Sequence, residues 1–309
     1  MTKSTMRVSN SEIQCFKRCR RKWWLAYYRR LTPRAEKLGG ALKFGTRVHE
    51  ALAAYYSPEP QDPIEVIRHE FDIARDEAAA AENVFLVEEL NKDAALALAM
   101  VEGYVQWVEE TGIDDGLEVI SVEEELAVEF DPLPVTLIGK LDTRIRRKSD
   151  GRLLSMDHKT CASFDGLTRT LELNEQPLMY QLLEHMSKPE DQHVTGGMYN
   201  MLRKVKRTAN AKPPFYMRET IHHNETELRN FWQRLYGVLT EMLDVTDRLE
   251  NGEPHYAVVY PTPTSTCAWD CEFRAVCPLF DDGSHAEGLI ESAYVAHNPY
   301  ERYKSEVTL

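Results

Sequence analysis

The feature that most constrains the fold is a change of hydrophobic period near residue 117. Before it, apolar residues recur at helical spacing, as in segments 9–31 and 63–111. After it, short stretches alternate or run apolar with Pro, Ser, Asp or Gly between them: LEVISVEEELAVEF, VTLIGKLDTRIRR and RLLSMDHKT. The later pattern predicts an antiparallel meander. We therefore expect an α/β protein with helices ahead of a sheet.

The helical segments carry start and end signals. Segment 9–31 begins with three candidate caps, SNS, and is expected to continue as one helix. A second helix is predicted from near Gly45. After the meander we expect a helix over EQPLMYQLLEHM, a strand over VTGGMYNMLRKV, and a long helix that Asn251 and Gly252 close.

One predicted strand ends in charged residues. In LLSMDHKTC, residues 153–161, Asp157 and Lys159 are two positions apart, so they share a face and lie roughly 6.6 Å apart along the strand. One interpretation is a weak surface ion pair worth about 0–1 kcal/mol. The other is a functional pocket.

Further residues favour the pocket. His49 is on an early helix, and Asp142 ends the GKLD segment of the preceding strand. Two carboxylates on adjacent strands can hold a hard divalent ion such as Mg²⁺ or Mn²⁺, and a histidine nitrogen can complete the site. Lys159 could then orient the attacking water. Taken singly, His49 also fits a packed or surface histidine and Asp142 a turn residue.

The charge distribution favours an anionic polymer as partner. The net charge is −13, but residues 60–131 hold 21 acidic and 3 basic side chains, so the remainder is net positive. Basic clusters occur at 17–22, 144–148 and 203–207. Each alone could be a solvated face. The residues predicted to contact the backbone of this polymer are Arg20, Arg21, Arg144 and Arg147.

The expected location is cytoplasmic, because the N-terminus lacks the apolar core of a secretory signal and no apolar run is long enough to span a membrane.

The cysteines predict metal or redox chemistry. Six unevenly spaced cysteines in a cytoplasmic chain favour metal binding over disulfides. Cys267, Cys271 and Cys277 need one more thiolate to close a four-coordinate site.

The order of GTRVHE, GKLDTRI, MDHKT and EQPLMYQLL resembles the RecB-like branch of the PD-(D/E)XK nucleases, over about residues 9–280 except the acidic helices. The resemblance implies a restriction-endonuclease-like core. It implies metal ligands at His49, Asp142, Asp157 and the backbone carbonyl of His158, with Lys159 catalytic. It also adds Gln176 and Tyr180 to the site; without it, both are ordinary residues of an amphipathic helix.

The cysteines resemble those of the iron–sulfur members, which include the AddB nuclease domain and the CRISPR-associated and phage exonucleases. This resemblance implies a [4Fe–4S] cluster held by Cys19, Cys267, Cys271 and Cys277. Zinc or no metal at all stay open. The three-residue spacer between Cys267 and Cys271, and Arg20 where many relatives have proline, depart from the family pattern. Cys15 is a weaker ligand candidate and Cys161 a buried thiol.

The function expected from these features is a metal-dependent DNA exonuclease acting on single-stranded or end-bearing DNA in recombination, repair or phage DNA processing. The expected nuclease domain covers 1–281, with an acidic helical insertion at 60–116, an iron–sulfur clasp joining 9–31 to 261–280, and a loose tail at 282–309. No helicase P-loop is present, so any helicase or recombination partner is a separate protein. The alternatives are a non-catalytic iron–sulfur DNA-binding scaffold and a restriction-type endonuclease.

Overall fold

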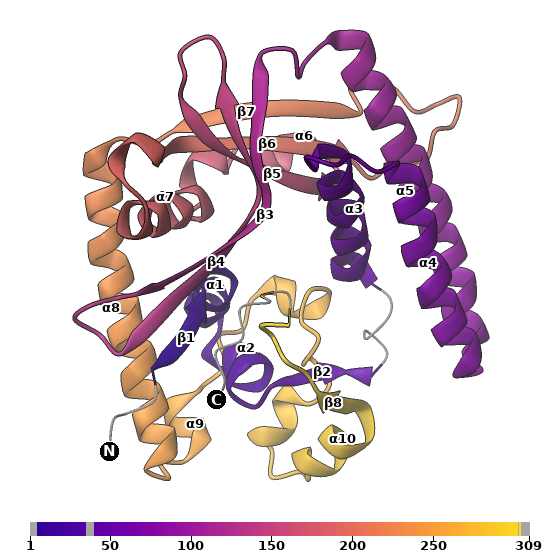
Figure 1. Ribbon diagram of the computed structural model, residues 1–309. Coiled ribbons are helices and arrows are strands. Elements are labelled where there is room, and N and C mark those ends of the chain that lie inside the picture. Colours follow the sequence, from indigo (N-terminus) through magenta and orange to yellow (C-terminus); the bar gives the residue numbers. More distant parts are fainter. Residues whose placement is uncertain (1–4, 35–39, 302, 304–309) are drawn as a thin grey trace. The chain divides into compact units, whose positions relative to one another are not determined.

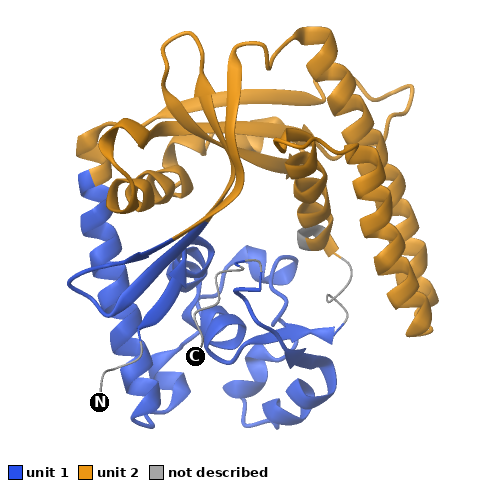
Figure 2. Ribbon diagram, in the orientation of Figure 1, with its two compact units in different colours: residues 1–37, 127–139, 229–309 blue, residues 38–126, 140–228 orange. Residues whose placement is uncertain are grey.

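The computed structural model describes residues 5–34, 40–301 and 303 (Figure 1). The chain forms two compact units (Figure 2). Unit 1 comprises residues 1–37, 127–139 and 229–309, and unit 2 comprises residues 38–126 and 140–228. Each is described by itself. None of the helices in the described ranges has the length and apolar character needed to cross a membrane.

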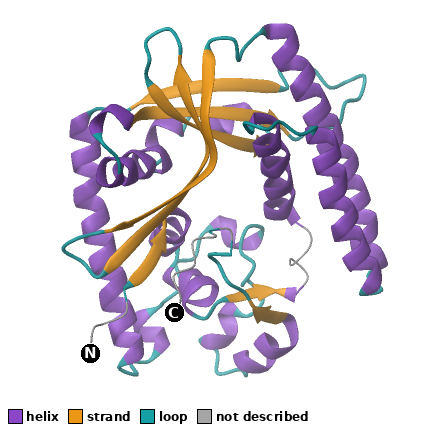
Figure 3. Cartoon of the chain, in the orientation of Figure 1, coloured by secondary structure: helices purple, strands orange, loops and turns teal. Residues whose placement is uncertain are grey.

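Unit 2 is built on a mixed sheet (Figure 3). Its strands are β3 (Leu117–Glu129), β4 (Val135–Arg147), β5 (Leu153–Cys161), β6 (Val194–Arg203) and β7 (Tyr216–His222). The strands β5, β6 and β7 belong to unit 2 entirely, whereas β3 belongs to it up to residue 126 and β4 from residue 140. β3 pairs with β4, and the β4–β5 pair is antiparallel, as expected for the hairpin of a meander. β5 and β6 are parallel, which requires the crossover that the helices between them supply.

One face of this sheet is covered by the helices that precede it in the sequence. They are α3 (Gly40–Tyr56), α4 (Pro63–Ala80) and α5 (Val84–Thr111). Val48, Ile67 and Val101, one from each helix, share a core cluster with Ile145 and Leu154 of the sheet. Most of the acidic segment at 60–116 thus lies in α4 and α5, and the apolar side of these helices is part of the main core of unit 2.

The crossover helices lie on the other face. They are α6 (Phe164–Thr168), a 3-10 turn (Leu171–Leu173), α7 (Gln176–Ser187) and a second 3-10 turn (Glu190–Gln192). A Cβ at Gly197 of β6 would lie 3.1 Å from the ring of Pro177, in the first turn of α7. Glycine at this position therefore lets the start of α7, which includes Gln176, approach the sheet closely.

Unit 1 contains the elements from both ends of the chain. Its N-terminal elements are β1 (Met6–Ser9), α1 (Asn10–Arg18), α2 (Arg20–Trp23), a π-helical turn (Trp24–Tyr28) and β2 (Leu31–Pro33). Its C-terminal elements are most of α8 (Glu225–Glu250), then α9 (His255–Val258), 3-10 turns at Ser265–Ala268 and Cys277–Phe280, α10 (Ala286–Ala293) and β8 (Tyr294–Ala296). β1 runs parallel to the first residues of β4.

Two parts of unit 1 differ from the sequence-based expectation. The segment after 282, expected to be loose, forms α10 and β8, because β8 pairs antiparallel with β2 and Tyr294 is buried; residues 304–309 lie outside the described part. The helix expected over 9–31 is interrupted at Cys19, which is extended (φ −162°, ψ 113°) between α1 and α2. Cys19 therefore lies between the two helices and belongs to neither.

Candidate active site

Two carboxylates meet where β4 and β5 separate. The antiparallel ladder between these strands ends at the pair Thr143 and Met156. The next residues beyond it are Asp142 and Asp157, so they lie opposite each other on the same face of the sheet. Asp142 is only 8% exposed and Asp157 only 6%. The strand pairing therefore places two nearly buried acids side by side.

His49 and a backbone amide hold Asp142. Nδ1 of His49, on α3, lies 3.1 Å from Oδ2 of Asp142, and the His158 amide donates to the same oxygen over 3.0 Å. Burial raises the pKa of Asp142, but the facing His49 outweighs this and lowers the pKa below its ordinary value. Burial lowers the pKa of His49, and the Asp142 charge more than reverses this. The two groups therefore favour the charged forms of each other.

Lys159 and Gln176 hold Asp157. Nζ of Lys159 lies 2.5 Å from Oδ2 of Asp157 and donates to Oε1 of Gln176 over 3.0 Å. Nε2 of Gln176 donates to Oδ1 of Asp157 (2.9 Å) and to the hydroxyl of Tyr180 (2.8 Å), which donates to the Lys140 carbonyl (2.9 Å). One helix face thus fixes both the acid and the lysine.

The chemistry of the donors fits a hard divalent ion. Oδ2 of Asp157 is buried, and the partner that it has among the described residues is the Lys159 ammonium. Burial raises the pKa of Asp157, so a cation nearby would stabilise its charged form. As the side chains stand, Asp142 turns to His49 and Asp157 to Lys159. In residues 5–34, 40–301 and 303, no three His, Cys, Asp or Glu side chains converge on one ion position.

A buried polar network supports the strand behind the carboxylates. Nδ1 of His158 lies 2.9 Å from Nδ2 of Asn200, which also donates to the Tyr104 hydroxyl over 2.9 Å. Nε of Arg218 donates to Oδ1 of Asn200 (3.0 Å), and its Nη2 donates to the hydroxyls of Tyr56 and Tyr104 (2.8 Å each). Burial lowers the pKa of His158 to about 3, so its ring is neutral.

Comparison with known proteins identifies the family of the chain. The sequence pattern of the PD-(D/E)XK nuclease superfamily matches residues 7–278. The chain belongs to this superfamily. No curated protein matches it. Its mixed sheet with flanking helices is consistent with the PD-(D/E)XK core.

Two solved structures resemble the nuclease over much of its length. One is a candidate exonuclease from Eubacterium rectale, with 13% identity, a TM-score of 0.47, and coverage of 81% of this chain and 83% of the other. The second is SSO0001, with 14% identity, a TM-score of 0.30, and coverage of 66% of this chain and 80% of the other.

The arginines predicted to contact DNA have protein partners in the nuclease. Arg21 is 1% exposed and pairs with Asp281 at 3.0 Å; Arg144 is buried and pairs with Glu184 at 3.0 Å. Arg20 pairs with Glu241, and Arg147 pairs with Asp150 at 2.6 Å. Their role in DNA binding stays a prediction, and the structure gives each of them a role in the protein itself.

The cysteines of the predicted cluster all belong to unit 1. Sγ of Cys19 accepts from the Thr262 amide, and Sγ of Cys267 from the Thr264 amide, each over 3.4 Å. Burial raises the pKa of Cys277, Arg21 lowers it, and the nearby Cys19 and Cys271 raise it further. The ion pairs Arg18–Asp270 and Lys22–Glu272, both 2.7 Å, join the same two segments. The cluster itself stays a prediction.

The structure adds residues that the sequence reasoning missed. Asn200, Arg218, Tyr56 and Tyr104 come from four elements of unit 2, and each resembles an ordinary strand or helix residue in the sequence. The one available signal is Arg218, a charged residue inside a short strand. Nothing local indicates that it donates to Asn200, the residue that contacts His158.

Proposed function

We propose that the protein is a metal-dependent DNA exonuclease that acts on single-stranded or end-bearing DNA. The observation that carries the proposal is the grouping of Lys159 and Gln176 with Asp157, opposite Asp142 and its partner His49. This supplies two nearly buried acids for a cation and a lysine beside them. Membership of a nuclease superfamily directs the proposal to phosphodiester hydrolysis.

The residues of the chain would divide the work as follows. Asp142, Asp157, His49 and the carbonyl of His158 would hold Mg²⁺ or Mn²⁺, which when bound would supply positive charge for the phosphate and a more acidic water. Lys159, kept in place by Gln176, would orient the attacking water and stabilise negative charge as the phosphate reacts. Tyr180 would fix Gln176 through their hydrogen bond.

A [4Fe–4S] cluster on Cys19, Cys267, Cys271 and Cys277 is part of the same proposal. Its support is the break of the helix at Cys19 and the amide donors to Cys19 and Cys267, since hydrogen bonds to sulfur are common at such clusters. We propose a structural role, because every candidate for the cleavage chemistry lies in unit 2. A separate helicase or recombination protein would supply DNA ends in recombination, repair or phage DNA processing.

The direct test is digestion of end-labelled single-stranded DNA with Mg²⁺ or Mn²⁺, comparing 5′ and 3′ labels. We expect products released from one end by the wild type and by Arg152→Ala, which changes an exposed arginine outside the basic clusters. Lys159→Ala should bind DNA without cleaving it. Cleavage of circular single-stranded DNA would indicate an endonuclease instead. DNA binding by the wild type with no cleavage under any metal would support the non-catalytic scaffold.

A further inference from the structure

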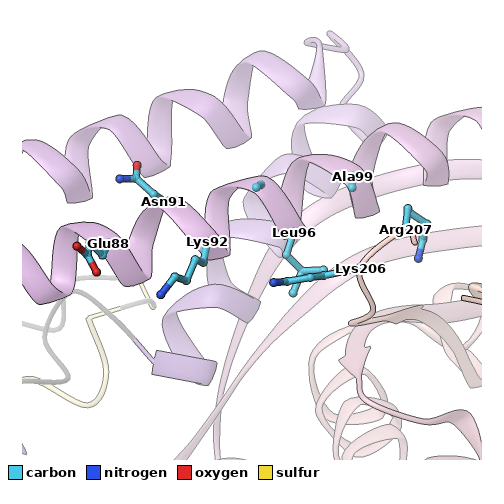
Figure 4. A pocket seen from close by; sticks show the side chains of 8 residues that line it. Glu88, Asn91, Lys92, Leu96, Ala99, Lys206 and Arg207 are labelled. Carbon is cyan, nitrogen blue, oxygen red and sulfur yellow. The ribbon is translucent and has the colours of Figure 1, made fainter. Parts of the chain in front are cut away.

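A groove with a cationic rim lies in unit 2, apart from the carboxylates (Figure 4). It has a volume of about 570 Å³ and is formed by α5 and the connection between β6 and β7. Its lining residues are Glu88, Asn91, Lys92, Ala95, Leu96, Ala99, Lys206 and Arg207. The floor is therefore mostly alanine and leucine, while the rim holds three cations and one acid.

The cations stand out against the charge of their surroundings. Lys92 is one of only three basic residues within 60–131, where 21 side chains are acidic. Lys92 and Lys206 are exposed, and neither forms an ion pair with another described residue. In Figure 4, the side chain of Lys206 lies beside Leu96. Unneutralised cations above an apolar floor suit a ligand that carries both phosphate and an aromatic base.

The groove is built into the fold. The Arg207 guanidinium lies 3.8 Å from the ring centroid of Phe215 and donates to the Tyr216 hydroxyl over 2.7 Å. That hydroxyl donates in turn to the Met100 carbonyl of α5 over 2.8 Å. A Cβ at Gly103 would lie 2.5 Å from the same hydroxyl, so glycine permits the close approach. These contacts fix the basic connection against α5.

The groove adjoins the end of β5, the strand that carries Asp157 and Lys159. β5 and β6 run parallel, and Lys159 pairs with Met201. Past that pair, the Lys204 amide donates to the Cys161 carbonyl over 2.7 Å. Lys206 is five residues beyond Met201, which limits the separation of their Cα atoms to roughly 17 Å. A DNA strand held at Lys159 could thus continue into the groove.

We propose that this groove binds the phosphate backbone of single-stranded DNA next to the segment being cleaved, with a base on its apolar floor. The inference rests on the proposed function. Phosphates would contact Lys92, Lys206 and Arg207, and Ala95, Leu96 and Ala99 would contact the base. An acidic protein segment would also suit these cations. We favour a nucleic acid because, in the proposed function, DNA already binds at the neighbouring carboxylates.

The test is binding of labelled oligothymidylate in EDTA, where cleavage is absent, over a range of salt concentrations. The variant is Lys92→Gln/Lys206→Gln; the matched control is Arg68→Gln/Arg152→Gln, two exposed cations of unit 2 that lie outside the three basic clusters. Each lost phosphate contact should reduce the slope of log K against log salt by about 0.7, hence about 1.4 for the groove variant. The control should keep the wild-type slope. The groove variant should match the wild type on the shortest oligomers and weaken on longer ones.

The outcomes separate the two proposals. A wild type that cleaves DNA, together with a groove variant of unchanged slope, would overturn the groove and leave the nuclease function standing, with a protein segment as the remaining occupant. Equal losses in variant and control would reveal a general charge effect and also overturn the groove. A loss that is the same for all oligomer lengths would place these lysines at the cleavage site instead. A wild type that neither binds nor cleaves DNA would refute both proposals.

Discussion

Arg218 should be among the residues of unit 2 that are most costly to remove. Its side chain is 6% exposed and forms an ion pair with Asp114 at 2.5 Å. It also donates to Asn200 and to the hydroxyls of Tyr56 and Tyr104. In Arg218→Leu, the Tyr56 hydroxyl still bonds to that of Tyr104 and donates to Asp114, whereas Oδ1 of the fully buried Asn200 loses its donor.

The expected loss of stability follows from these contacts. Removing one partner of a buried ion pair costs about 3–5 kcal/mol, because the other charge is left without compensation. Asp114 is 25% exposed, so water can solvate part of its charge and the lower figure, about 3 kcal/mol, applies. At about 2–4 °C per kcal/mol, the thermal midpoint should fall by roughly 6–12 °C.

The assay is urea and thermal unfolding of Arg218→Leu beside Arg146→Leu. Arg146 also pairs with an acid, Glu118 at 2.8 Å, but its side chain is 44% exposed. That variant should lose less than about 1 kcal/mol. DNA cleavage by Arg218→Leu should also slow, since the network no longer fixes His158. Equal stability losses in the two variants, or a loss under about 1 kcal/mol in Arg218→Leu, would refute the reasoning.

Three further predictions follow from individual residues. Gln176→Leu should lower the cleavage rate about 10–100-fold in single-turnover assays with DNA binding unchanged, since it removes the partner that orients Lys159; a wild-type rate would contradict this. The pKa of His158 is lowered to about 3, so below pH about 6.5 the unfolded chain binds a proton that the folded chain does not. Stability should therefore fall as pH drops from about 6.5 towards 3, by about 1.4 kcal/mol per unit from this group, and His158→Gln should lack this component in pH-dependent unfolding; an identical pH slope would count against it. Cys19→Ser should lose iron, sulfide and the absorption near 400 nm of anaerobically purified protein and, by analogy with a long-loop cross-link, about 5 kcal/mol of stability. Cys161→Ser should keep both properties, and an iron-free wild type that holds stoichiometric zinc would replace the cluster while leaving the cross-link argument in place.

The strands and the acids were predictable because their signals are local. β4, β5 and β6 each carry their period within about ten residues, and Asp157 and Lys159 share a face through strand alternation alone. Gln176 is different, because its role depends on the contact of Pro177 with Gly197, two residues far apart in sequence. Its place in the site came from the family resemblance and could not come from helical spacing.

Charge and helical pattern were poorer guides. A cluster such as KRCRRK gives the sign of a surface but not its partners, and Arg21 finds Asp281 some 260 residues away. The segment through WWLAYY has a continuous helical pattern, yet the helix breaks at Cys19, where the sulfur meets the Thr262 amide. Long-range contacts of this kind leave no trace in the local sequence.

The division of the chain into two units bears on the order in which the protein can fold during synthesis. Unit 2 ends at residue 228, whereas unit 1 needs residues 229–309. Domains generally fold as units, and those completed first on the ribosome can fold first. The carboxylates, Lys159 and Gln176 all belong to the part that is complete when Cys267, Cys271 and Cys277 have yet to be translated. Insertion of the proposed cluster would then be a late maturation step. If the cluster is present, a cell short of iron would accumulate chains in which unit 2 has formed and unit 1 is unfinished.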